Sequence, residues 1–179
     1  MAEGRPAIPR ELKRAVLVEA GHRCAIPTCR AYPVEIEHID DWAQVREHSF
    51  ENLIALCPTC HRRKGDGPDQ IDRKSLRQYK TNLALLNQRY GDFERRVLEH
   101  FARLPNNDIV SLPGALDLML SYLIKDGILI KLTGGSEMSF TTVLATGHRL
   151  NVPATEHYLL TPAGRDLVNR WSEAQPFAN

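Results

Sequence analysis

Four cysteines in two short pairs are the residues of this 179-residue chain whose types and spacing most directly suggest chemistry. Cys24 and Cys29 form the first pair, and Cys57 and Cys60 form the second, with His61 directly after the last cysteine. Two such pairs commonly hold one zinc ion in a tetrahedral shell, which four thiolates complete. The alternatives are unrelated buried thiols or disulfides, and a thiol-keeping cytosol disfavours disulfides. The sequence therefore predicts a structural zinc site.

The segment between the cysteine pairs is longer than the gap of about 15 to 20 residues in ordinary zinc ribbons, so it must contain an insertion. Residues 34–38 alternate apolar and acidic side chains, apart from His38, which lies on the apolar side; this period of two predicts a half-buried strand. The apolar run at 53–56 predicts a return strand. Residues 59–64 can open a short helix behind Pro58, which suits a first-turn position. The expected order is strand, loop, strand, helix.

Three blocks in this segment resemble the HNH endonucleases, which have a ββα-metal fold. The blocks are Glu37-His38-Ile39, Asn52-Leu53 and Leu56-Cys57-Pro58-Thr59-Cys60-His61. They occur in the order of the family and at compatible spacing within about residues 20–65, which makes the combination more specific than any single block. The chain departs from the family pattern at Glu37, where Asp or His is frequent, and at Asp41, where proline is frequent. Glutamate is still a competent oxygen ligand.

The resemblance implies that Glu37 and His61 hold one catalytic divalent cation, Mg²⁺ or a similar ion, and that the products carry 5′-phosphates. It also implies that Asn52 orients His38 or completes the surroundings of the metal. Phosphodiester hydrolysis needs a nucleophilic water, charge stabilisation at the phosphate and help for the departing alkoxide, and a cation can supply the last two. A base remains to be supplied. A neutral imidazole can accept a proton from water near neutral pH, so His38 is the candidate base.

Each of these residues also has a structural interpretation. His38 could be a core histidine, and Glu37 a solvated strand residue. Asn52 could be a turn-former after the loop, and His61 could replace a cysteine as a zinc ligand, although four thiolates already complete the shell. His48 is interpreted as an exposed loop histidine, with an extra metal ligand or a phosphate contact as the alternative.

The run Arg62-Arg63-Lys64 follows His61 directly and is predicted to contact nucleic-acid phosphates. The alternative is an ordinary solvated face. Residues 1–90 hold 15 Lys and Arg against 12 Asp and Glu, and residues 91–179 hold 8 against 10, so the two halves carry formal charges of +3 and −2. Tight, salt-resistant DNA binding by a monomer is therefore not implied.

Helical periodicity follows the first segment and predicts helices over 72–90 and 92–104. The remainder resembles a winged helix: a helix near 113–125, strands over 128–132 and 139–145, and a last helix that begins at Pro162 behind a Thr161 cap. Residues 114–125 are apolar nearly all round, which predicts a buried helix and provides few groups for base readout. This favours a dimerisation or partner-docking domain over a second DNA-binding domain.

These observations predict an α+β protein with a zinc-stapled HNH nuclease domain at 1–70, a linker helix at 71–91 and a winged-helix-like domain at 92–179. The expected function is metal-dependent cleavage of DNA, with RNA as an alternative substrate. A non-catalytic, zinc-containing DNA-binding or transcription-regulatory protein is the alternative function. The expected partners are a second copy or a regulatory protein at the C-terminal domain, and the expected location is the cytoplasm, with no membrane segment. HNH nucleases occur in restriction, phage and antiviral defence systems.

Overall fold

The computed structural model describes residues 6–133 and 138–177, which form two compact units. The first unit joins the chain up to Gln88 with the segment from Arg170 onward, and the second spans Arg89–Asn169. These bounds differ from the predicted division at 70 and 91, because residues 73–88 group with the first unit instead of forming a separate linker, and because the C-terminal segment returns to that unit. None of the described helices has the length and apolar character that a membrane crossing requires.

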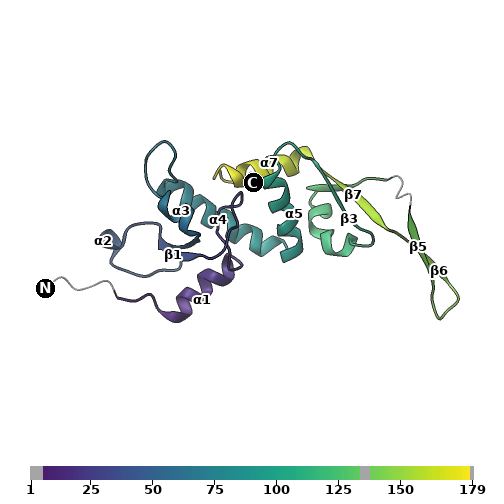
Figure 1. Cartoon of the computed structure of the whole chain (residues 1–179), viewed down its shortest axis with the longest axis horizontal. Helices are drawn as coiled ribbons and strands as arrows, with labels where there is room; N and C mark the ends of the chain where they lie inside the picture. The colour runs from purple at the N-terminus through teal and green to yellow at the C-terminus, as the bar shows by residue number, and fades with distance from the viewer. Residues whose placement is uncertain (1–5, 134–137, 178–179) are drawn as a thin grey trace. The chain divides into compact units, whose positions relative to one another are not determined.

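The first unit contains a two-stranded antiparallel sheet surrounded by helices (Figure 1). Its elements are α1 (Arg10–Glu19), β1 (Glu35–His38), α2 (Trp42–Val45), β2 (Leu53–Leu56), α3 (Pro58–Arg62) and the greater part of α4 (Arg73–Arg89). Strand β1 pairs with β2 in the register Glu35↔Leu56 to His38↔Leu53. The predicted order of strand, loop, strand and helix is confirmed.

The core of the first unit is built on β2, whose four residues are all buried. Val16 of α1 and Leu76 of α4 belong to the same buried cluster, together with three of the four cysteines. Cys29 packs against this cluster and is partly buried. A unit of this size has little apolar surface to bury, so a metal bound by the cysteines would add a substantial share of its stability.

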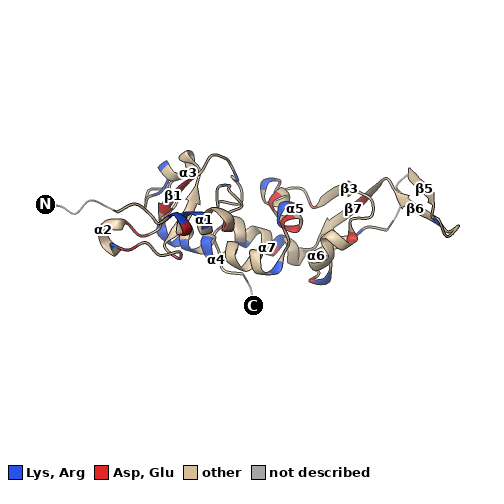
Figure 2. Ribbon diagram, turned by 90° about the horizontal axis from the view of Figure 1, so that it is seen from below, with Lys and Arg blue, Asp and Glu red and all other residues tan. Residues whose placement is uncertain are grey.

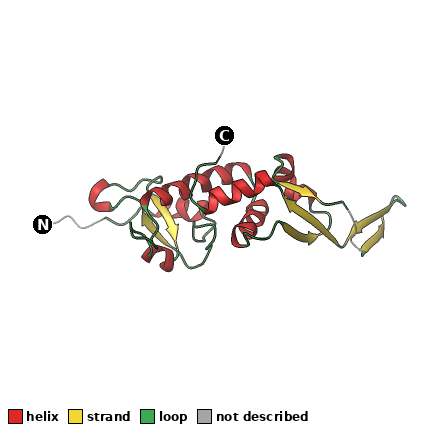
Figure 3. Cartoon of the chain, turned by 90° about the horizontal axis from the view of Figure 1, so that it is seen from above, coloured by secondary structure: helices red, strands yellow, loops and turns green. Residues whose placement is uncertain are grey.

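The second unit consists of a three-stranded antiparallel sheet, flanking helices and a separate β-hairpin (Figure 3). Its elements are α5 (Asp92–Arg103), β3 (Ile109–Pro113), the 3₁₀ helix η1 (Asp117–Leu120), α6 (Ser121–Lys125), β4 (Leu129–Lys131), β5 (Ser139–Val143), β6 (Arg149–Pro153), β7 (Thr155–Leu160) and most of α7 (Pro162–Ser172). The strands of the larger sheet lie in the order β3-β7-β4, and β5 pairs with β6 in the hairpin.

The predicted helices at 72–90, 92–104 and 162 onward are confirmed, and Thr161 caps α7, since its hydroxyl accepts a hydrogen bond from the Gly164 amide at 3.0 Å. The predicted helix over 113–125 is confirmed only in its second part. Pro113 ends β3, and the helical residues begin at Asp117, first as the 3₁₀ turn η1 and then as the five residues of α6. Because a 3₁₀ turn does not follow the 3.6-residue period, the apolar side chains are not all buried: Leu118 is 85% exposed and Tyr122 48%.

Candidate active site and metal centre

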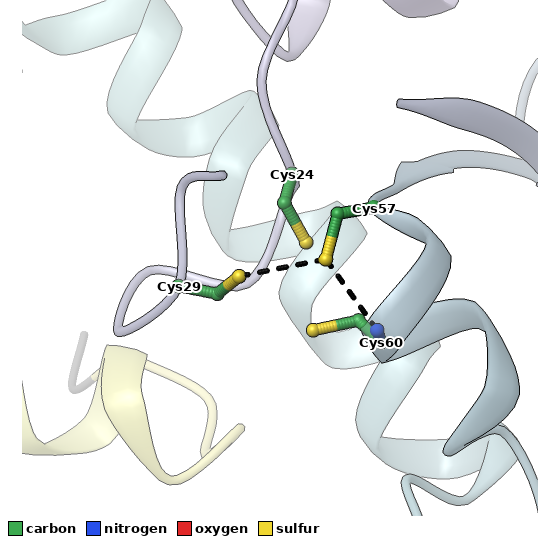
Figure 4. Close-up of side chains that lie close together, drawn as sticks. All are labelled: Cys24, Cys29, Cys57 and Cys60. Atoms are coloured by element: carbon green, nitrogen blue, oxygen red, sulfur yellow. Dashed lines mark hydrogen bonds between the residues drawn. The ribbon is translucent and has the colours of Figure 1, made fainter. Parts of the chain in front are cut away.

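The four cysteines lie at one point of the first unit, although they come from two distant segments. Cys24 and Cys29 lie in the loop after α1, whereas Cys57 precedes α3 and Cys60 lies within it. Figure 4 shows their sulfur atoms converging, and all four Sγ atoms lie within 4.8 Å of one another. In the part of the chain that the structure describes, they are the one group of three or more side chains placed to share a metal ion. The predicted convergence is confirmed.

The distances between these sulfur atoms fit a tetrahedral metal shell and do not fit a disulfide. The Sγ atoms of Cys29 and Cys57 are 3.7 Å apart, whereas a disulfide bond is about 2.05 Å long. Two thiolates on a zinc ion with bonds of about 2.3 Å lie about 3.8 Å apart in tetrahedral geometry. The Cys60 amide also donates to the Cys57 sulfur at 3.4 Å, so the backbone at the start of α3 supports a thiolate there.

The electrostatics of the cluster also favour a bound cation. Burial raises the pKa of the Cys24 thiol to about 11, and burial and the nearby Cys24 raise the pKa of the Cys60 thiol. Ionising these thiols in the interior is therefore unfavourable unless a positive charge joins them. A metal ion that replaces the thiol protons removes this penalty. The donor set is suited to zinc.

A second cluster of polar side chains lies on the other side of α3, around His61. A pocket of about 320 Å³ is lined by Glu37, Asp41, His61, Lys64, Gly65, Asp66 and Arg73. The Nε2 atom of His61 lies 2.9 Å from Oε2 of Glu37, so the two predicted metal ligands meet in this pocket. A carboxylate oxygen and an imidazole nitrogen that face each other at this distance can share a divalent cation.

The other ring nitrogen of His61 has a carboxylate partner as well. Nδ1 lies 2.6 Å from Oε2 of Glu35, which lies on the same face of β1 as Glu37 because side chains alternate along a strand. The helix α3 presents His61 to this face, with the His61 amide bonded to the Cys57 carbonyl at 2.8 Å. The cysteine cluster and the pocket are therefore joined through one short helix.

Lys64 enters the pocket instead of pointing into solvent, and its side chain is 13% exposed. Its ammonium group donates to the carboxylate of Glu37 at 3.1 Å, to the carbonyl of His38 at 2.6 Å and to the carboxylate of Asp41 at 3.0 Å. The Lys64 ammonium beside Asp41 holds the pKa of that carboxyl below its usual range, and Arg73 of α4 adds to the effect. Figure 2 marks acidic residues on β1 and basic residues on α4. In the pocket, Lys64, just after α3, pairs with Glu37 of β1, and Arg73 of α4 pairs with Asp41.

The predicted base, His38, is 1% exposed and does not line this pocket. Its ring lies on the opposite face of β1 from Glu37, near Trp42 at 5.8 Å and His48 at 5.1 Å between ring centroids. Its Nε2 atom is 3.0 Å from Nδ1 of His48, and Nε2 of His48 is 3.0 Å from the carbonyl of Pro6. The structure therefore places Glu37 and His61 together and His38 in a neighbouring ring cluster.

Asn52 fixes the turn that follows His38. Its side-chain oxygen accepts a hydrogen bond from the Asp40 amide at 2.7 Å, and its side-chain nitrogen donates to the Asp40 carbonyl at 3.0 Å. Its own carbonyl accepts from the Ile39 amide at 2.8 Å. These three contacts connect the end of β1 to the residue before β2, and they involve the backbone next to His38.

Residues 22–67 match the HNH endonuclease family. This HNH segment contains both cysteine pairs, β1, β2 and α3, and it indicates a nuclease domain. No curated protein and no solved structure matches the chain.

The geometry adds residues to the site that the sequence had not singled out. Glu35 and Trp42 contact predicted site residues, and Arg73 lines the pocket from outside the HNH segment. The alternation of Glu35 and Glu37 was a usable signal for the first, whereas Arg73 had none, because its position depends on how a later helix returns to β1. His48, interpreted from the sequence as an exposed loop histidine, is partly buried and contacts His38.

Proposed function

We propose that this chain is a metal-dependent endonuclease that hydrolyses DNA phosphodiester bonds, with a structural zinc ion at the four cysteines. The observation that carries the proposal is the meeting of Glu37 and His61 at 2.9 Å in a pocket at the HNH segment. A scaffold that brings a carboxylate and an imidazole together beside several basic groups is suited to bind a cation and a phosphate.

The roles of the pocket residues follow from their positions. Glu37 and His61 would hold the divalent cation, Mg²⁺ or a similar ion, which would neutralise charge on the phosphate and on the departing alkoxide. Two protein ligands leave the remaining coordination positions to water and to phosphate oxygens, an arrangement that Mg²⁺ favours. Lys64 keeps the Glu37 carboxylate oriented toward His61, since it donates to the other carboxylate oxygen at 3.1 Å.

His38 is the residue that we assign to the activation of water, as a neutral imidazole at the end of β1 next to Glu37. Asn52 would support this role indirectly, by holding the backbone of the turn after His38. His38 lies outside the lining of the pocket, so its role needs a test of its own. A variant at this position is therefore the deciding one.

The three consecutive basic residues are not equivalent in this proposal. Arg62, the last residue of α3, and Arg63 directly after it are exposed and are assigned to phosphates of the bound strand. Lys64 has its ammonium on three oxygens of the pocket. We therefore assign Lys64 to the pocket and only the two arginines to the nucleic acid outside it.

The second unit is proposed to be winged-helix-like and to assemble or regulate the nuclease. Its support is the strand order β3-β7-β4, with the β5–β6 hairpin inserted between β4 and β7. Exposed apolar side chains such as Leu118 and Phe140 favour protein contacts over nucleic-acid contacts in this unit. Light scattering would test assembly, since a monomer with full cleavage activity contradicts it.

Cleavage of supercoiled plasmid with Mg²⁺ or Mn²⁺ tests the proposal. Wild type is expected to nick or linearise the DNA, whereas Glu37→Gln, His38→Ala and His61→Ala each lose about 100-fold or more in rate. Glu47→Ala, an exposed change in the loop after α2, is the matched control and keeps wild-type activity. Zinc content is measured for every variant, so that loss of the fold is recognised.

Three results would count against the proposal. Binding of DNA without cleavage in any divalent ion would favour the non-catalytic, DNA-binding alternative. Equal cleavage by wild type and His38→Ala would remove His38 from the mechanism. Preferential cleavage of a matched RNA would replace the proposed substrate with RNA.

A further inference from the structure

Glu35 lies outside the set of residues to which the proposed reaction assigns a role, yet it makes one of the shortest contacts at the site. Its Oε2 atom is 2.6 Å from Nδ1 of His61. A second carboxylate oxygen, Oε2 of Glu37, lies 2.9 Å from the other ring nitrogen, Nε2. A cation bound by Nε2 would need the lone pair of that nitrogen, which leaves the hydrogen of His61 on Nδ1, where the Glu35 carboxylate can accept it.

The sequence and the register of the sheet explain how Glu35 reaches this position. Glu35 and Glu37 lie two residues apart on β1 and share one face of it. Their partners on β2 are Leu56 and Ile54, so Glu35 lies next to the residue that precedes Cys57 and α3. One face of β1 thus presents two carboxylates to the two nitrogens of a single ring.

The stability of the fold does not account for this contact. The side chains of Glu35 and His61 are 56% and 40% exposed, and ion pairs this exposed contribute about 0–1 kcal/mol. Its consequence is orientational, because a carboxylate on one nitrogen of a histidine fixes the ring plane and the tautomer, and makes the other nitrogen a better ligand. The contact is therefore suited to a metal ligand.

We propose that Glu35 is a positioning residue for the divalent-cation site, which acts by holding His61 with Nε2 directed into the pocket. The inference rests on the proposed function, since it assumes that His61 is a ligand. Glu35 does not touch the cation or the substrate in this arrangement. It sets the affinity of the site for the cation.

The test is calorimetric titration of the zinc-loaded full chain with Mn²⁺, without nucleic acid. Glu35→Ala is expected to raise the dissociation constant for Mn²⁺ about 10- to 100-fold, the range found for partners of metal-bound histidines. Glu35→Gln keeps an oxygen that accepts from Nδ1, so it should recover most of the affinity. Glu47→Ala removes an exposed carboxylate from the same unit and controls for the change in charge, while His61→Ala defines the loss of the site.

A second measurement separates positioning from a purely structural role. In plasmid cleavage, Glu35→Ala should need about 10- to 100-fold more Mn²⁺ for half-maximal rate and should approach the wild-type rate at saturating Mn²⁺. Its zinc content and its melting temperature should match those of wild type.

The outcomes distinguish this inference from the proposed function. Wild-type affinity in Glu35→Ala, together with loss of binding in His61→Ala, would overturn the role of Glu35 and leave the metal site intact. A wild-type chain that binds no Mn²⁺ through His61 would overturn the proposed metal centre, and the role of Glu35 with it. A deficit in Glu35→Ala that equals that in Glu47→Ala would reduce the effect to overall charge.

Discussion

The tautomer of His38 follows from contacts that begin outside the HNH segment. The carbonyl of Pro6 can only accept a hydrogen bond, so Nε2 of His48, 3.0 Å away, carries a hydrogen. In a neutral ring, Nδ1 of His48 is then an acceptor, and Nε2 of His38 donates to it at 3.0 Å. In a neutral His38 ring, the lone pair is then on Nδ1.

This tautomer can be measured without any assay of activity. Two-bond ¹H–¹⁵N correlations on histidine-labelled protein should show the His38 hydrogen on Nε2 in wild type. The pattern should persist in His48→Asn, whose side-chain oxygen can accept in place of Nδ1, and should be lost in His48→Ala. Glu47→Ala, in the same loop, should leave it unchanged. A wild-type spectrum with the hydrogen on Nδ1 would contradict the assignment.

A buried ion pair between α1 and α4 carries a prediction about stability. The ammonium of Lys80 lies 2.6 Å from the carboxylate of Glu19, and the two side chains are 9% and 10% exposed. Lys80→Met removes one partner and leaves a buried charge, so the first unit should lose about 3–5 kcal/mol of its free energy of unfolding. Urea titration followed by fluorescence measures this, because both tryptophans, Trp42 and Trp171, belong to this unit.

The pH dependence of that variant has a defined sign. Burial raises the pKa of Glu19 above its ordinary value even with Lys80 nearby. A group whose pKa is raised in the folded state contributes to the free energy of unfolding at pH values below its unfolded-state pKa. This contribution is lost as the pH rises through its folded-state pKa. Without Lys80 the pKa rises further, so the deficit of Lys80→Met should shrink in acid, and Glu19→Gln in the same chain should remove this dependence. A deficit that grows as pH falls would contradict the argument.

At the scale of the elements, the junction of β4 and α7 has no room for a side chain at Gly164. A Cβ atom on Gly164 would lie 2.4 Å from the carbonyl oxygen of Ile128. That oxygen also accepts from the Thr161 amide at 3.0 Å, so it cannot move without loss of this hydrogen bond. Gly164→Ala should destabilise the second unit by about 1–3 kcal/mol.

A matched control exists in the same unit. Gly91 has a φ of −66°, and a Cβ there would meet its nearest neighbour at an ordinary 3.7 Å. Gly91→Ala should therefore cost only what the poorer N-cap preference of Ala implies, about 0.5–1 kcal/mol, because it creates no clash. Hydrogen exchange of the β4 and β7 amides would compare the two variants, and equal protection in both would contradict the packing argument.

The elements also show how far the sequence determines this structure. The helices α4 and α5 were predicted to within about one residue, because their apolar residues repeat with a helical period and Gly91-Asp92 separates them. For the segment at 113–125 the prediction of one continuous helix was only partly right. Its continuous apolar run has no period that would distinguish a helix from the end of a strand followed by a 3₁₀ turn. The local structure does not explain why an exposed residue such as Leu118 is apolar.

The contacts of the candidate site likewise fall into those that the sequence predicts and those that it does not. The convergence of the cysteines follows from their spacing, and the meeting of Glu37 with His61 follows from the HNH blocks. The contacts of Glu35, His48 and Lys64 depend on side-chain directions and on a loop that returns to β1. No local sequence pattern predicts such contacts, so they are seen only in the folded structure.

At the scale of the whole molecule, removal of the zinc ion that we propose at the four cysteines should affect the two units differently. The four cysteines belong to the first unit, and their cluster is continuous with its core. A strong chelator should therefore unfold this unit and shift the emission of Trp42 and Trp171, while the second unit keeps its secondary structure. Calorimetry should show one of two transitions lost, and re-addition of Zn²⁺ should restore it. Unchanged emission after complete removal of the metal would contradict this.

The return of the C-terminal segment to the first unit sets the order in which the protein can be completed. The hydroxyl of Tyr79 donates to the Ser172 carbonyl at 2.9 Å, and the fully buried side chain of Asn82 donates to the Gln175 carbonyl at 2.8 Å. During synthesis these partners emerge only after all of residues 89–169. The ribosome must therefore synthesise the whole second unit before the first unit can complete these buried contacts, so the two units of the chain are made in a nested order.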